Sequence, residues 1–222
     1  WCITKEEKYP EEIILQWESW KKNNPFCYGI NWVSTIEVSI RVLNLLFSMN
    51  LISDSICFKK IEKSISKNIR EHGLFIEHNL EIGINGNNII FGNHYLSNIC
   101  AISIIGMTVK NIPESSRWAK SGIKALEDAM DEMVLDDGFY FESSTHYHRF
   151  ALELFLYPYL VAKNNDFSFS KNYELKLRKM FSVLNYLSTP GGIIPQIGDN
   201  DDGRLFILQN YSDWDRNNFQ YL

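Results

Sequence analysis

Three short segments of the chain gather side chains that can transfer protons or bind an anion. They are residues 92–96 (GNHYL), residues 137–149 (DGFYFESSTHYHR) and residues 198–203 (GDNDDG), and the first two hold three of the five histidines. Amide, imidazole and phenol groups donate hydrogen bonds, and imidazole, phenol and carboxyl groups serve as general acids or bases. These segments are therefore the first places to look for an active site.

Each segment also has an ordinary structural explanation. An Asn that precedes a helix is a common cap, His and Tyr in a first turn are often half-buried, and a run of Asp, Asn and Gly makes turns. Any one segment alone therefore favours a structural role, and only the combination points to a function.

In combination and order, the segments resemble the heparinase II/III-like polysaccharide lyases, a family that includes heparan sulfate and alginate lyases. In that family an Asn-His pair follows a helix ending in a Leu-Glu pattern, and a segment of the type Asp-Gly-x-x-x-Glu-x-Ser-x-x-Tyr-His comes later. The matching residues here are His78-Asn79-Leu80-Glu81, Asn93-His94, and Asp137, Gly138, Glu142, Ser144, Tyr147 and His148. Asn31-Trp32, residues 37–41 (EVSIR) and the GDNDDG segment extend the resemblance over about residues 25–204.

The resemblance implies β-elimination on a uronate-containing acidic polysaccharide. The C5 proton of a uronate is too weakly acidic to be removed until hydrogen bonds or positive charge neutralise the neighbouring carboxylate. Asn93 matches the family's neutralising residue, and His94 matches a residue that some members use in the same pocket. Tyr147 matches the catalytic tyrosine, which is the acid for the leaving glycosidic oxygen and in some members also the base.

Further residues are substrate-binding candidates, and each has a competing structural role. Trp32 can form the floor of a sugar subsite or pack in the core. The other candidates are Asn31, Glu142, His148 and Arg149, where the last two can equally lie on an exposed helix face or form a salt bridge with Glu142. An Arg41–Glu37 pair is interpreted as structural.

Asn93 and Tyr147 are both expected at the beginning of a helix. Unpaired backbone N–H groups and the helix macrodipole favour negative charge there. We therefore expect these positions to help bind a uronate carboxylate and to lower the pKa of Tyr147, even though the net charge of the chain is −5.

Two other functions stay open. A glycoside hydrolase would use Glu142 with Asp199 or Asp201, which requires two acids about 5–10 Å apart on either side of the scissile bond. A glycan-binding or polysaccharide-assembly component would bind an oligosaccharide without turnover. Only the lyase leaves a C4–C5 double bond in its product.

The pattern along the chain is a succession of helices separated by Gly, Pro, Asn and Asp, which predicts an all-α fold. The resemblance implies an incomplete (α/α) toroid, and an irregular bundle is the alternative. A Ser34–Glu37 capping box is expected to open one helix, Gly73 to close the next, and Ser143 or Ser144 to cap another. The expected helices span residues 11–22, 34–50, 54–71, 93–110, 113–135, 144–163 and 172–187, with a shorter helical piece at 74–81 and a loop at 83–92.

We expect residues 1–190 to form a helical domain that is truncated at its N-terminus. Residues 191–222 are expected to be a linker and first strand, around residues 204–208, leading to a missing β-sandwich. In the family this sandwich supplies a further catalytic His or Tyr, so the chain is interpreted as a fragment.

Composition limits the possible partners. Hydrophobic residues make up 45% of the 222 residues and charged residues 22%, as in an ordinary globular protein. The net negative charge argues against nucleic acid and anionic membrane surfaces, and the apolar runs are too short or too polar to span a bilayer. Four widely spaced cysteines suggest no metal site, and we expect no cofactor. The resemblance implies a periplasmic or secreted protein that acts on an acidic polysaccharide, and the oligomeric state is not indicated.

Overall fold

The computed structural model describes residues 1–85, 88–201 and 203–207. Within them the chain forms seven α-helices, a short 3-10 helix and a two-stranded antiparallel hairpin. The elements are α1 (Lys8–Asn23), η1 (Ile30–Trp32), α2 (Thr35–Leu51), α3 (Ile56–His78), β1 (Gly83–Asn85), β2 (Asn88–Ile90), α4 (Asn93–Thr108), α5 (Ser115–Met133), α6 (Thr145–Lys163) and α7 (Lys171–Leu187). The predicted all-α class is confirmed.

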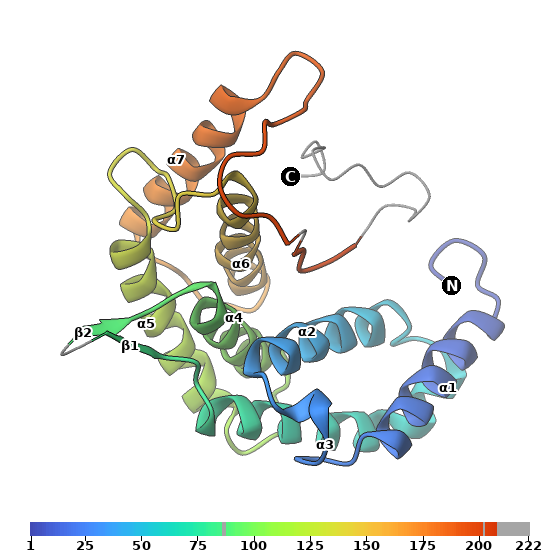
Figure 1. The fold of residues 1–222 in the computed structure, drawn as a ribbon. Helices are drawn as coiled ribbons and strands as arrows, with labels where there is room; N and C mark the ends of the chain where they lie inside the picture. The colour runs from blue at the N-terminus through green and yellow to red at the C-terminus, as the bar shows by residue number, and fades with distance from the viewer. Residues whose placement is uncertain (86–87, 202, 208–222) are drawn as a thin grey trace.

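The helices follow one another around an arc, and they alternate between its two sides (Figure 1). Helices α2, α4 and α6 line the inner side and pack on one another, whereas α1, α3, α5 and α7 form the outer side. Each inner helix also packs on the outer helix that follows it. This alternation is the arrangement of paired helices expected for an incomplete toroid.

Helix α4 is the centre of the core. It is buried on nearly every side, from Leu96 to Met107, and this explains its continuous apolar sequence. Its contact with α5 depends on two glycines, because a Cβ on Gly106 would lie 2.2 Å from the Ala119 nitrogen and one on Gly122 would lie 2.7 Å from Cα of Ser103.

Local capping fixes several helix starts. The side chains of Ser55, Ser144 and Ser170 each accept a hydrogen bond from the backbone N–H three residues later, at the starts of α3, α6 and α7. The predicted cap at Ser144 is confirmed. The predicted Ser34–Glu37 capping box is wrong, because the Ile36 N–H donates to Glu81 over 2.7 Å, and Ser34 donates to the same carboxylate.

Three further expectations about the elements are wrong. Helix α3 does not end at Gly73 but continues to His78. The glycine serves packing instead of termination, since it makes room for the ring of Trp118, which a Cβ would meet at 2.5 Å. The expected loop at 83–92 contains the β1–β2 hairpin, of which residues 86 and 87 lie outside the described part. Residues 204–207 form no strand, and residue 208 also lies outside the described part.

Candidate active site

Asn93 and Glu142 come together where α4 begins, although 49 positions separate them in the sequence. The Asn93 carboxamide nitrogen donates to Glu142 Oε2 over 2.9 Å and lies 3.3 Å from Oε1, and the Asn93 backbone nitrogen donates to Oε1 over 3.1 Å. Asn93 is the first residue of α4, where backbone N–H groups have no partner inside the helix. The structure thus confirms the expected helix start and adds a carboxylate to it.

His94 is held by a second carboxylate. Its Nδ1 lies 3.2 Å from Glu81 Oε1, and its side chain is about half exposed. Glu81 is the same residue that binds Ser34 and the Ile36 N–H at the start of α2, and its own backbone N–H donates to the buried Asn98. Because Nδ1 faces Glu81, the other ring nitrogen of His94 is the one directed away from this contact.

Tyr147 lies in the first turn of α6 and meets the segment that follows α7. Its hydroxyl donates to Asp201 Oδ2 over 3.1 Å. Burial and then the charge of Asp201, followed by those of Glu142 and Asp199, raise the Tyr147 pKa to about 12. The expectation that the helix start would lower this pKa is wrong, since nearby carboxylates disfavour the phenolate. Glu142, which binds Asn93, lies five positions before Tyr147, in the segment that leads into α6.

The segment that carries Asp201 is fastened along α6, and we call its described residues, 195–201 and 203–205, the strap. Thr145 donates from its hydroxyl to the Pro195 carbonyl over 3.0 Å and from its backbone N–H to the Ile197 carbonyl over 3.0 Å. The Ser144 hydroxyl donates to the Asp199 carbonyl. Figure 1 shows this segment, in orange to red, passing beside α6. The contact between Asp201 and Tyr147 is therefore made in a position that α6 itself sets.

His148 and Arg149 are buried and do not face a substrate. His148 is fully buried, with Nδ1 accepting from the Tyr140 N–H over 3.0 Å and Nε2 lying 3.0 Å from the Met180 carbonyl. Burial lowers the pKa of His148. Arg149 is 1% exposed and pairs with Glu153 rather than with Glu142. Neither the substrate-binding prediction nor the exposed-face alternative is therefore correct for these two residues.

Trp32 and Asn31 belong to the short helix η1, which precedes α2. Trp32 is 6% exposed, and its ring packs against those of His72 and Phe75, at centroid distances of 4.8 and 5.3 Å. Trp32 is thus a core residue, which is the structural role considered for it in the sequence. Asn31 is exposed and donates from its side chain to Asn24.

Arg41 is structural, as expected, but its partner differs from the prediction. Its Nε donates to His72 Nε2 over 3.1 Å, and its guanidinium lies over the rings of Trp20 and Trp32, 4.5 and 4.8 Å from their centroids. Burial lowers the Arg41 pKa to about 10. The aromatic cluster between α1, α2 and α3 therefore replaces the proposed pairing with Glu37.

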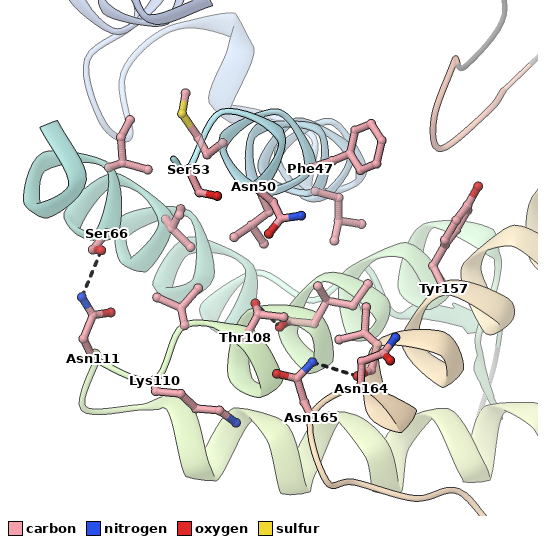
Figure 2. A pocket seen from close by; sticks show the side chains of 18 of the residues that line it. Phe47, Asn50, Ser53, Ser66, Thr108, Lys110, Asn111, Tyr157, Asn164 and Asn165 are labelled. Carbon is pink, nitrogen blue, oxygen red and sulfur yellow. Dashed lines mark hydrogen bonds between the residues drawn. The ribbon is translucent and has the colours of Figure 1, made fainter. Parts of the chain in front are cut away.

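An open cavity of about 790 Å³ lies at the opposite end of α4 from Asn93. Figure 2 shows Phe47, Thr108 and Tyr157 among the residues that line it, together with a series of asparagines. None of the residues predicted for catalysis or substrate binding lines this cavity. In the described part of the chain, no group of three or more His, Cys, Asp or Glu residues is arranged to hold a metal ion. The same part contains no helix that is long and apolar enough to cross a membrane.

The arc of paired helices and the polar residues at the inner helix starts define an α/α-toroid domain. The family described as Heparinase II/III N-terminus matches residues 1–220, and the chain belongs to this family. The resemblance noted in the sequence is therefore confirmed.

Relatives of known sequence agree with this assignment. The chain is 26% identical to a heparin-sulfate lyase of Pedobacter heparinus over 96% of its own length and 32% of that protein. It is 21% identical to a heparin-sulfate lyase of Bacteroides thetaiotaomicron, over 94% of this chain and 30% of the relative. The chain thus spans about a third of the length of these relatives.

Solved structures share the fold. The crystal structure of a heparinase III superposes with a TM-score of 0.70 at 20% identity, over 86% of this chain and 29% of the other. The heparan sulfate lyase HepC from Pedobacter heparinus superposes with a TM-score of 0.66 at 25% identity, over 90% of this chain and 32% of the other. These likenesses confirm the predicted helical toroid.

Proposed function

We propose that the protein to which this chain belongs is a polysaccharide lyase that cleaves a uronate-containing acidic glycan by β-elimination. The observation that carries the proposal is that Asn93, at the start of α4, binds Glu142, which lies just before α6, the neighbouring inner helix whose first turn holds Tyr147, in a chain of this family. Relatives named heparin-sulfate lyases make a heparan-type glycan the first substrate to test.

In the proposed reaction, Asn93 and His94 neutralise the uronate carboxylate. The Asn93 amide donates a hydrogen bond, and His94 presents the ring nitrogen that does not face Glu81. Removal of negative charge from the carboxylate makes the C5 proton more acidic. The electron pair left at C5 then forms the C4–C5 double bond as the bond from C4 to the glycosidic oxygen breaks.

Tyr147 is proposed as the general acid for the leaving oxygen. A phenol with a pKa of about 12 is protonated at neutral pH, so it can donate its proton but is a poor base. The C5 proton then needs a different base, for which the family resemblance implies a His or Tyr from a following domain.

We accordingly propose that residues 1–190 are the helical domain, that residues 191–222 lead to a β-sandwich, and that the protein is periplasmic or secreted.

The test is the ultraviolet absorbance of unsaturated uronyl products while the longest natural form of the protein is incubated with a panel of uronate polysaccharides. We expect absorbance to rise with at least one glycan and the rise to disappear in Tyr147→Phe. Products without a double bond would favour the hydrolase, particularly if Glu142→Gln alone abolished their formation. Oligosaccharide binding without any product would instead favour the glycan-binding or assembly role.

A further inference from the structure

We propose that Glu142 is a positioning residue that selects the orientation of the Asn93 carboxamide. The inference rests on the proposed function, in which this amide donates to the uronate carboxylate. It replaces the sequence-based prediction that Glu142 contacts the substrate directly.

Glu142 makes contacts to Asn93 that a direct substrate ligand would not need. Both of its carboxylate oxygens lie within 3.3 Å of the Asn93 amide nitrogen, and one of them also accepts from the Asn93 backbone N–H. Gly92, the residue before α4, has no side chain with which to cap the helix. The Glu142 carboxylate thus serves as the cap of α4 and as the partner of its first side chain.

The backbone around Glu142 is fixed on both sides. Before it, Tyr140 is fully buried and forms an antiparallel bridge with Val134, and the Phe141 N–H donates to the Met133 carbonyl over 3.0 Å. After it, Ser143 has a φ of 57°, in the left-handed region that a serine rarely adopts. Strained backbone of this kind persists only where the surrounding structure holds it, and it is concentrated at functional sites.

Gly92 leaves the space that Glu142 requires. A Cβ on this glycine would lie 3.0 Å from Glu142 Oε1, which is tighter than ordinary contact. The φ of Gly92 is −128°, which any residue can adopt. The glycine therefore leaves room for the close approach of the carboxylate, and its own backbone conformation does not require it.

The chemistry of the Glu142–Asn93 pair explains why one orientation of the carboxamide is selected. An ionised carboxylate only accepts hydrogen bonds, so it binds the NH₂ end of a carboxamide and repels the oxygen end. One N–H of Asn93 is then directed at Glu142, and the second diverges from it and is available to a substrate carboxylate. A flipped amide would present its oxygen in that place and would repel the uronate.

The first experiment is a double-mutant cycle in the full natural protein. Glutamine at position 142 keeps the size of the side chain but can pair with either end of the Asn93 amide, so we expect Glu142→Gln to lower kcat/KM by about tenfold. In an Asn93→Ala background the same substitution is expected to change kcat/KM by less than about twofold. Effects that multiply independently would overturn the proposal. Glu77→Gln, which alters a surface pair with Arg117, is the matched control and should retain normal activity.

The second experiment does not depend on turnover. In a crystal structure of Glu142→Ala we expect the Asn93 side chain to leave its position or to occupy several rotamers, and an unchanged Asn93 would overturn the proposal. If Glu142→Ala fails to fold, Glu142→Asp supplies the same readout, because the shorter side chain withdraws the carboxylate from Asn93. If Asn93 is displaced in the variant but the wild-type protein forms no unsaturated product, the positioning role is supported and the lyase function is rejected. Failure of the positioning proposal can therefore be distinguished from failure of the proposed function.

Discussion

Arg149 and Glu153 form an ion pair one turn apart on α6, with Arg149 Nη1 2.9 Å from Glu153 Oε1 and both side chains 1% exposed. The same two side chains bind the strap. Arg149 Nη2 donates to the Gly203 carbonyl, and Glu153 Oε2 accepts from the Leu205 N–H over 2.7 Å. The pair therefore fixes the strap to the inner helix that carries Tyr147.

Arg149→Met is expected to destabilise the protein severely. It breaks the buried ion pair with Glu153 by removing one partner, which costs about 3–5 kcal/mol of unfolding free energy. Urea unfolding followed by circular dichroism measures the loss. Lys124→Met breaks an exposed pair of the same spacing, with Asp128, and should change little. Equal, small losses of unfolding free energy in the two variants would contradict the prediction. The prediction also requires the double variant Arg149→Met/Glu153→Leu to be more stable than Arg149→Met.

Asp201→Asn is expected to shift the alkaline limb of the pH–activity profile to lower pH. The Asp201 charge helps raise the Tyr147 pKa to about 12, so its removal lets the phenol ionise at a lower pH. If Tyr147 donates its proton in the reaction, activity falls as pH rises through this pKa. The profile of kcat/KM on a uronate glycan measures the shift, with Asp166→Asn in the turn after α6 as control. An activity that increases through the same pH range would instead identify Tyr147 as the base.

Stability is expected to fall as pH decreases from about 6.5 to about 4. Burial is the main cause that lowers the His72 pKa to about 4, and the nearby Arg41 charge acts in the same direction, while the bond to the Asn68 carbonyl opposes them. In this window the unfolded chain binds a proton at position 72 and the folded chain does not, so acid favours unfolding by about 3 kcal/mol in total.

Urea midpoints measured between pH 7 and pH 4 test this effect. His72→Gln cannot titrate, so its stability should depend less steeply on pH, whatever its absolute value. The remaining slope includes His148, whose pKa burial also lowers. Parallel curves for the wild type and His72→Gln would contradict the prediction.

Gly106→Ala is expected to destabilise the fold although alanine favours helices. The added Cβ would lie 2.2 Å from the backbone nitrogen of Ala119, so α4 and α5 must separate. Overpacking of this kind costs about 1–3 kcal/mol, which exceeds the helix-propensity gain of about 1 kcal/mol. Thermal unfolding measures the difference. Gly191→Ala, where the nearest atom is 3.9 Å away, should leave the transition unchanged, and a stabilised Gly106→Ala would show that the helices are not in close contact.

The sequence predicted the helices best where the signal is local. Ser144 caps α6 because serine and the N–H group it binds are three residues apart. The capping of α2 was predicted wrongly because the residue that accepts from the Ile36 N–H, Glu81, lies 45 residues away, and no local pattern can reveal such a partner. The same limit hid the Glu81–His94 contact and the pairing of Glu142 with Asn93.

The candidate site shows a second limit of prediction from the sequence. Consecutive residues of a helix point about 100° apart, so the neighbours of a site residue cannot all face the site. Tyr147 is partly accessible, whereas His148 and Arg149 beside it are buried. Motif order identified the segment, but which face of α6 lies inward depends on α7 and the strap, which pack on it from later in the chain.

The strap also determines how the molecule would respond to mechanical load. Tension on the chain after Ile207 would first meet the packing of the Phe206 ring on Phe47 and Tyr157. The first hydrogen bonds to be loaded would be those of Leu205, where Glu153 binds the backbone nitrogen and Asn44 binds the carbonyl oxygen, and the next would be at Gly203, where Arg149 binds the carbonyl. Only a force large enough to break these bonds would reach Asp201 and the Tyr147 hydroxyl. Movements of the later part of the chain are thus isolated from the phenol by two successive attachments to α2 and α6.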